Sequence, residues 1–197
     1  RGLIRLDQVF DDNTYYRAGY RPTNFDQGFR GKVTLRDALV ASLNIPAIRA
    51  LEQVGPRILH NELNGYLNGS LSTQADAGLS LAVGGLYLTP EQVAMIYMGL
   101  ADPGLARELT FESEQQVATD MTLISRATSD KILDLLIQEM SNGERVAFKT
   151  GTSYARQDAW SVHIYENHLI VVWMGTPDNE PTSSLTGVGS AFPLSLE

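Results

Sequence analysis

The residues best suited to chemistry stand together in the stretch Lys149-Thr150-Gly151-Thr152-Ser153. Apolar residues precede it and an alternating apolar run follows, a pattern that predicts one strand of a hairpin sheet. Side chains alternate along a strand, so Thr150 and Thr152 would point to one face and Lys149 and Ser153 to the other. Gly151 has no Cβ, so a ligand backbone could approach closely there. Two hydroxyls beside a lysine suit capture of a carboxylate, but these residues alone fit a polar edge strand at least as well.

A second candidate lies where a helix is expected to break. Thr34 begins that helix, with a capping hydroxyl followed three residues later by an acid. Because the residue before a proline avoids the α region, Ile45 is expected to be extended, with the helix ending near Asn44 and Pro46 opening the next one. At such a break Ser42 and Asn44 could point to the same side and line a cleft. Taken alone, these two residues are better interpreted as caps of the helix C-terminus.

The length and composition of the chain limit the classes of protein and of site to which these candidates can belong. The 197 residues suffice for one domain with a core, and 43% are hydrophobic. A net charge of -8 argues against nucleic-acid binding, and the absence of cysteine removes disulfide and thiol chemistry. The three histidines (His60, His163, His168) lie far apart and are interpreted as surface or loop residues. We therefore expect no metal site and no cofactor.

The rest of the chain predicts helices that flank an antiparallel sheet. Residues 1–33 read as an ordered loop, and residues 56–80 as short helical pieces and loops. Thr89-Pro90 opens a further helix with a glutamine at the capping-box position. Another helix is predicted from about residue 129 to 140, ended by Asn142-Gly143. Strands are predicted over three ranges: 146–153, 158–165 and 168–175.

Taken together, these motifs carry a family resemblance. Ser42-Leu43-Asn44 has the form S-x-N, Lys149 to Ser153 reads K-T-G-T-S, and Asp158-Ala159-Trp160 follows. With Ala82-Val83-Gly84-Gly85 and Thr89-Pro90 between them, the chain resembles the transpeptidase domain of class A penicillin-binding proteins. Two stretches, Tyr20 to Asp26 and Thr176-Pro177-Asp178, are most similar to the penicillin-binding protein 1C branch. The resemblance implies one α/β (α+β) domain over residues 1–197, of the penicillin-binding transpeptidase and serine β-lactamase type, with its N-terminal part missing.

One departure from the family concerns the nucleophile. The family uses the serine of an S-x-x-K motif, and none of Lys32, Lys131 and Lys149 has a serine three residues before it. Thr128-Ser129-Asp130-Lys131 resembles that motif superficially and is interpreted as a helix cap. Because the chain opens on Arg1 rather than methionine, we expect a fragment whose nucleophile lies before Arg1 and which is inactive alone.

The resemblance implies a peptidoglycan D,D-transpeptidase with assigned roles. Ser42 would relay protons, Asn44 would contact the substrate amide, and Lys149 would keep the site positive. Thr150 to Ser153 would bind substrate: the hydroxyls of Thr150 and Thr152 take the terminal carboxylate, and the Thr152 N–H joins the oxyanion hole. Asp158 and Trp160 are assigned to support, with ordinary strand packing the favoured interpretation.

The implied partners are stem peptides ending in D-Ala-D-Ala and β-lactams. The parent chain would carry an upstream glycosyltransferase domain and a membrane anchor, on the periplasmic face of the inner membrane. Two alternatives stay open: a serine β-lactamase or D,D-carboxypeptidase, and a non-catalytic cell-wall binding or scaffold module. An S-x-x-K motif before Arg1 would favour an enzyme over a binding module.

Overall fold

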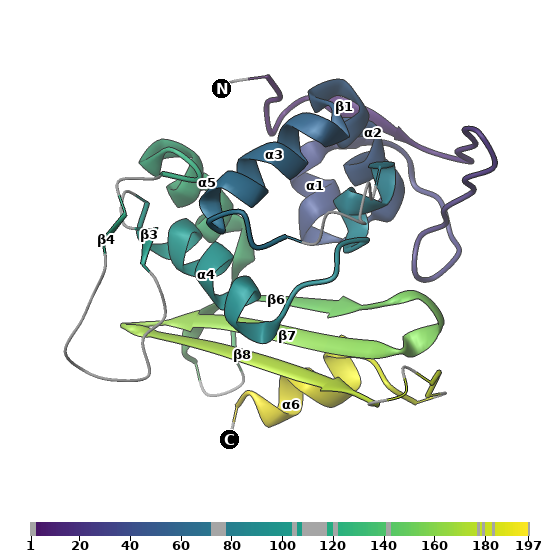
Figure 1. Ribbon diagram of the computed structural model, residues 1–197. Helices are drawn as coiled ribbons and strands as arrows, with labels where there is room; N and C mark the ends of the chain where they lie inside the picture. Colours follow the sequence, from purple (N-terminus) through teal and green to yellow (C-terminus); the bar gives the residue numbers. More distant parts are fainter. Residues whose placement is uncertain are drawn as a thin grey trace. The chain divides into compact units, whose positions relative to one another are not determined.

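The protein is described by a computed structural model in which two compact units are distinguished (Figure 1). The described residues are 3–71, 78–103, 106–107, 118–119, 122–140, 143–176, 178, 180–182 and 184–196. The first unit comprises Arg1–Gly65 and Ser70–Tyr87, and the second Tyr66–Gly69 and Leu88–Glu197. Among the described residues, no helix combines the length and the apolar character needed to cross a membrane. The grouping of residues 1–197 into one domain stays a prediction.

The first unit begins with a two-stranded ribbon that the sequence did not predict. Strand β1 (Val9–Asp12) pairs antiparallel with β2 (Gly31–Thr34), so the segment expected to be only loop is closed at its base. Helix α1 (Leu35–Val40) follows, and the Thr34 side chain accepts a hydrogen bond from the Asp37 N–H at 3.1 Å. The predicted helix start at Thr34 is confirmed.

The predicted end of that helix is wrong. Helix α1 stops at Val40, and α2 (Asn44–Val54) already begins at Asn44, so Ile45 is helical and fully buried. Pro46 is tolerated because an N–H in the first turn of a helix has no intrahelical partner to lose. Helix α3 (Pro56–Tyr66) and the 3-10 helix η1 (Gly78–Val83) follow. One core cluster of the unit consists of Tyr15, Ile45 and Ile48, packed against Tyr20, Leu79 and Ala82.

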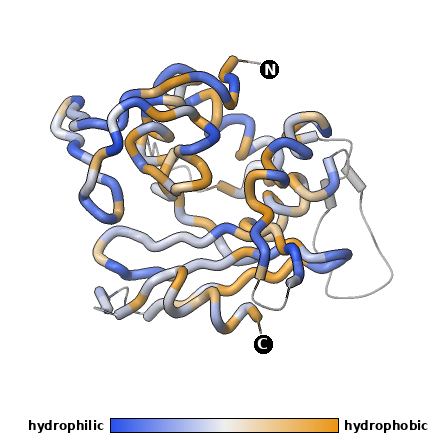
Figure 2. The backbone as a smooth tube through the Cα atoms, turned by 180° about the vertical axis from the view of Figure 1, so that it is seen from behind, coloured by the Kyte–Doolittle hydropathy of each residue, from blue (hydrophilic) through white to orange (hydrophobic). Residues whose placement is uncertain are grey.

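The second unit is built on a four-stranded antiparallel sheet in the order β5-β6-β7-β8. The three predicted strands are confirmed as β6 (Arg145–Thr152), β7 (Asp158–Tyr165) and β8 (His168–Gly175). Figure 2 shows hydrophobic stretches along the strands and a hydrophilic turn between β7 and β8. Strand β5 (Ile137–Glu139) was missed, because that range was assigned to a helix reaching residue 140.

Helices cover both faces of this sheet (Figure 1). Helices α4 (Pro90–Ala101) and α5 (Arg126–Leu136) contact β8 and β6 from one side. Thr89 and Gln92 form the predicted capping box of α4. Of the predicted stop at Asn142-Gly143, Asn142 lies outside the described residues. A short ribbon of β3 (Ala106–Arg107) and β4 (Ala118–Thr119) lies between the two helices in the chain.

The C-terminal segment covers the opposite face. The π-helix η3 (Gly187–Ala191) and α6 (Phe192–Leu194) lie against β7. Its apolar contacts form a core of Ala159, Leu185 and Ala191, with Val172 and Met174 packed against it.

A buried polar cluster fastens this C-terminal segment to the sheet. His163 on β7 is 2% exposed, so its interpretation as a surface or loop residue is wrong. Its Nε2 lies 2.9 Å from Ser195 Oγ, which donates to the carbonyl of Phe192 at 2.6 Å and lies 3.3 Å from Ser161 Oγ. Burial lowers the pKa of His163, so its neutral form is favoured in the fold.

Candidate active site

Ser42 occupies a strained position at the end of α1. Its N–H donates to the Leu39 carbonyl at 3.1 Å, and the next residue, Leu43, donates to the Ala38 carbonyl at 2.8 Å. This is a Schellman motif with Ser42 at the left-handed position, φ +53°, where glycine is usual. A residue with a Cβ costs of order 1 kcal/mol there. The Ser42 backbone therefore ends the helix, while its exposed side chain is not required for that cap.

The backbone N–H and the side chain of Asn44 are both hydrogen-bonded to residues outside α2. Leu43 stands at the N-cap position of α2 and cannot cap with its side chain. The side-chain oxygen of Asn24 accepts from the Asn44 N–H instead, at 2.8 Å. Asn44 Nδ2 in turn donates to the Thr23 carbonyl at 2.8 Å. The sequence did not point to Asn24, because its partner Asn44 lies twenty residues further along the chain.

The K-T-G stretch lies on β6, and its side chains alternate as predicted. Thr150 pairs with Ser161 and Thr152 with Ala159, whereas Lys149 pairs with Val162. The two threonines therefore share a face, and the Thr152 hydroxyl accepts a hydrogen bond from the N–H of Gly187, at 2.9 Å. Thr152 thus has a partner inside the chain on the side of the C-terminal segment.

Lys149 is half-buried on the opposite face of the strand. Its Nζ donates to the carbonyl of Thr150 at 2.6 Å. Burial lowers the pKa of Lys149, because an ammonium loses hydration inside the protein. The Lys149 side chain is therefore held close to the strand backbone.

The outer edge of β6 is open beside the motif. Strand β5 pairs only with residues 145–147, so among the described residues no second strand pairs with 148–152. A Cβ added to Gly151 would meet Trp160 Cβ at 3.7 Å, an ordinary contact. Packing within the described chain therefore does not require glycine at position 151.

The turn after β6 is closed by Ser153 and Asp158. The Asp158 N–H donates to Ser153 Oγ at 2.8 Å, and the Ser153 N–H donates to the Asp158 carbonyl at 3.0 Å. The Asp158 carboxylate accepts from the Trp173 indole at 2.9 Å. Asp158 thus links β7 to β8, which fits the supporting role expected for it. The Ser153 hydroxyl serves the turn in this structure, and its predicted contact with a ligand stays a prediction.

The two motifs belong to different units: Ser42 and Asn44 to the first, Lys149 to Ser153 to the second. Their convergence on one site stays a prediction.

Ser129, in the stretch that resembles S-x-x-K, is fully buried in α5 and donates to the Leu100 carbonyl. The helix is capped by Ser125, which accepts from the Thr128 N–H at 3.3 Å, so the interpretation of Thr128-Ser129 as the cap is wrong. The burial of Ser129 fits a structural role for this residue rather than a catalytic one.

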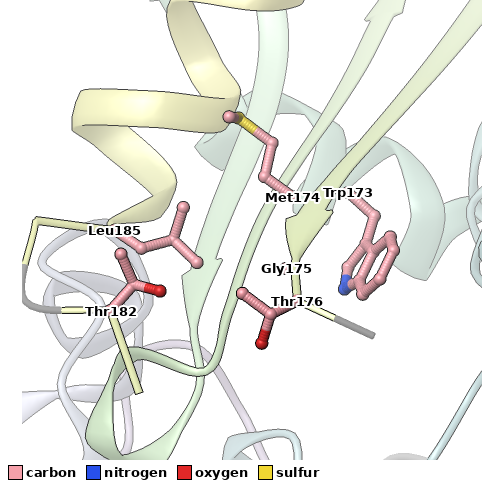
Figure 3. Close-up of a pocket in the computed structure, with 6 residues that line it drawn as sticks. All are labelled: Trp173, Met174, Gly175, Thr176, Thr182 and Leu185. Atoms are coloured by element: carbon pink, nitrogen blue, oxygen red, sulfur yellow. The ribbon is translucent and has the colours of Figure 1, made fainter. Parts of the chain in front are cut away.

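An open pocket of about 370 Å³ lies elsewhere on the second unit (Figure 3). Its lining residues are Trp173, Met174, Gly175, Thr176, Thr182 and Leu185. It lies along β8, which is separated from β6 by β7, and its lining contains no titratable side chain. It offers no acid, base or cation and is not a candidate for the chemistry suggested by the motifs.

Comparison with known proteins gives a consistent result. Residues 1–180 match the family described as the penicillin binding protein transpeptidase domain. Penicillin-binding protein 1C of Escherichia coli is 33% identical over 201 residues, which cover 98% of this chain and 26% of that protein. The chain thus spans about a quarter of the length of the curated relatives it matches.

Two solved structures share the fold. Penicillin-binding protein 1A of Haemophilus influenzae superposes with a TM-score of 0.81 at 20% identity, over 96% of this chain and 38% of that one. PonA1 of Mycobacterium tuberculosis, in complex with penicillin V, superposes with a TM-score of 0.74 at 22% identity, over 95% of this chain and 61% of that one. The predicted fold class is confirmed.

Proposed function

Since the chain belongs to the penicillin-binding protein transpeptidase domain family, we propose that it supplies part of the active site of a peptidoglycan D,D-transpeptidase. In this proposal Ser42, Asn44 and Lys149 are catalytic, and residues 150–153 bind the substrate. The observation that carries it is the serine of S-x-N at the left-handed position of the α1 cap, in a chain whose residues 1–180 match that family. Strain alone does not assign a function, since six other described non-glycine residues also have positive φ, among them Glu166.

The open edge of β6 suits a stem peptide bound as an added strand. The terminal carboxylate of the peptide would lie against the hydroxyls of Thr150 and Thr152. Because the Thr152 oxygen already accepts from Gly187, its hydroxyl hydrogen can be donated to that carboxylate. The ammonium of Lys149 would add positive charge to the site from the opposite face of the strand. Glycine at position 151 then serves the approach of the ligand backbone, since packing does not require it.

The reaction is acyl transfer in two steps. A serine oxygen attacks the carbonyl of the penultimate D-Ala, and its proton passes by way of a lysine and Ser42 to the departing D-Ala amine. An amine of a second stem peptide then attacks the acyl-serine, releasing the serine and forming the cross-link. The N–H of Thr152 would stabilise the oxyanion, a contribution typically of ~3–4 kcal/mol. We place the attacking serine and its lysine outside these 197 residues, which contain no S-x-x-K.

Broader features of the whole protein belong to the same proposal. We extend the proposal to an upstream glycosyltransferase domain, a membrane anchor and a periplasmic location, which the similarity to penicillin-binding protein 1C supports. Binding of β-lactams is supported by the relative that was solved with penicillin V.

A covalent labelling experiment tests the proposal. The full-length gene product and the 197-residue chain are each incubated with a fluorescent penicillin, then analysed by denaturing gel and intact mass. We expect a stable stoichiometric adduct on the full-length protein and none on the 197-residue chain. No adduct on the full-length protein would favour the binding-module alternative. An adduct that hydrolyses within seconds would favour a β-lactamase or carboxypeptidase, and an adduct on the 197-residue chain would mean that the nucleophile is misplaced.

A further inference from the structure

A buried polar pair lies beneath the S-x-N turn in the first unit. Asp12 on β1 is 0% exposed and Asn24 in the following loop is 2% exposed. Buried polar groups are costly unless each is hydrogen-bonded. The partners of this pair therefore show what it holds in place.

The side-chain amide of Asn24 has partners on both ends. Its Nδ2 donates to Asp12 Oδ1 at 2.8 Å and to the Gly28 carbonyl at 2.8 Å. Its Oδ1 accepts from the N–H of Asn44 at 2.8 Å and from that of Ile45 at 3.3 Å. Reversing the amide would set donors against donors and acceptors against acceptors, so only one orientation is satisfied. Asn24 thus provides the N-cap that Leu43 lacks.

Asp12 fixes Asn24 in turn. Its Oδ2 accepts from the Arg30 N–H at 2.8 Å and from Asn24 Nδ2 at 3.1 Å, so one carboxylate joins β1 to the interior of the following loop and to its last residue before β2. The neighbouring Thr23 carbonyl accepts from Asn44 Nδ2 at 2.8 Å. Both the backbone and the side chain of Asn44 are therefore held by residues 23–24.

We infer that Asp12 and Asn24 are positioning residues for the S-x-N motif, an inference that rests on the proposed transpeptidase function. Asn24 acts by setting the start of α2 and the orientation of the Asn44 side chain, and Asp12 acts by orienting Asn24. Neither residue has to touch substrate. A segment that reads as loop in the sequence thereby determines where a catalytic asparagine points.

The test uses the full-length protein and its second-order rate of acylation by a fluorescent penicillin, corrected for the folded fraction. Asn24→Asp places a second buried carboxylate beside Asp12, and Asp12→Asn sets an amide donor against a donor. We expect each to lower the rate by about 10- to 100-fold, since small misplacements of reacting groups cost this much. The matched exposed controls Asn61→Asp and Asp11→Asn should stay within about twofold of wild type, as surface changes usually do.

A double-mutant cycle separates positioning from general stability. If Asn24 acts through Asn44, Asn24→Asp should have less effect on acylation in an Asn44→Ala background than in wild type. Full multiplication of the two effects would overturn the inference. A wild-type rate of acylation in the Asp12→Asn variant would also overturn the inference. Because Asp12→Asn is the milder change, this test remains available even if Asn24→Asp does not fold. Failure of the wild-type protein to react at all would instead refute the proposed function.

Discussion

Replacing Ser42 with glycine should stabilise the protein and impair its reaction at the same time. Glycine adopts the left-handed conformation at φ +53° without the cost that a Cβ imposes. Relief of about 1–2 kcal/mol of strain is offset by the greater freedom of glycine in the unfolded chain, about 0.5–1 kcal/mol. The net gain is about 0.5–1 kcal/mol, which raises the melting temperature by about 1–4 °C in a chain of this size. Loss of the hydroxyl should slow acylation by about 10²-fold or more, the usual contribution of a positioned proton-transfer group.

The assay pairs differential scanning fluorimetry with penicillin acylation of the full-length protein. Ser42→Ala is the control for the hydroxyl, because it keeps the Cβ and its strain and should slow acylation without stabilising. Glu166→Gly is the control for strain relief, because Glu166 has φ +50° in the turn between β7 and β8. It should stabilise without changing acylation. Wild-type acylation in Ser42→Gly would remove Ser42 from the catalytic residues, and equal stability of the glycine and alanine variants would refute the strain argument.

Three further predictions concern the second unit. Gly187→Ala should lower the free energy of unfolding by about 3 kcal/mol, because its Cβ would lie 2.5 Å from the Gly151 carbonyl oxygen. Gly151→Ala should leave the free energy of unfolding unchanged and slow acylation. Urea denaturation measures the stability of both variants. Lys149→Met should raise the free energy of unfolding at neutral pH, since burial lowers the lysine pKa, while acylation is lost. The wild-type melting temperature should fall between pH 7.5 and 5, because burial lowers the pKa of His163 and the unfolded state therefore binds a proton there at a higher pH than the folded state, below about pH 6.5. His163→Gln should reduce this fall. His168→Gln, which changes an exposed histidine, should not.

Each of these has an outcome that contradicts it. Equal destabilisation by the two glycine substitutions would show that both positions are constrained by packing alone. A destabilised Lys149→Met protein would mean that the ammonium stabilises the fold through its hydrogen bonds rather than costing it stability. An unchanged pH dependence in His163→Gln would assign the acid sensitivity to other groups.

Local patterns in the sequence were sufficient for much of the second unit. Strands β6, β7 and β8 and the capped start of α4 were predicted because alternation and capping depend on residues close together in the chain. The S-x-N and K-T-G motifs, read in order, also pointed to the family.

The sequence was misleading where a distant partner decided the local structure. The proline rule placed Ile45 in an extended conformation, yet Ile45 is helical because its N–H and that of Asn44 are bonded to Asn24. Strand β5 formed where helical periodicity suggested a longer helix, because pairing with β6 outweighed propensity.

The sequence by itself therefore determined the family, the main strands and the identity of the motif residues. The tertiary structure alone decided that Ser42 is strained, that no second strand among the described residues pairs with the motif stretch of β6 and that His163 is buried. It also showed that Asp12 and Asn24 hold the S-x-N turn. The physical reason is that periodicity and capping depend on residues close together in the chain, whereas the hydrogen-bond partner of a buried polar group can come from any segment that the fold brings near. The spacing of Asp12, Asn24 and Asn44 along the chain does not predict that they are hydrogen-bonded.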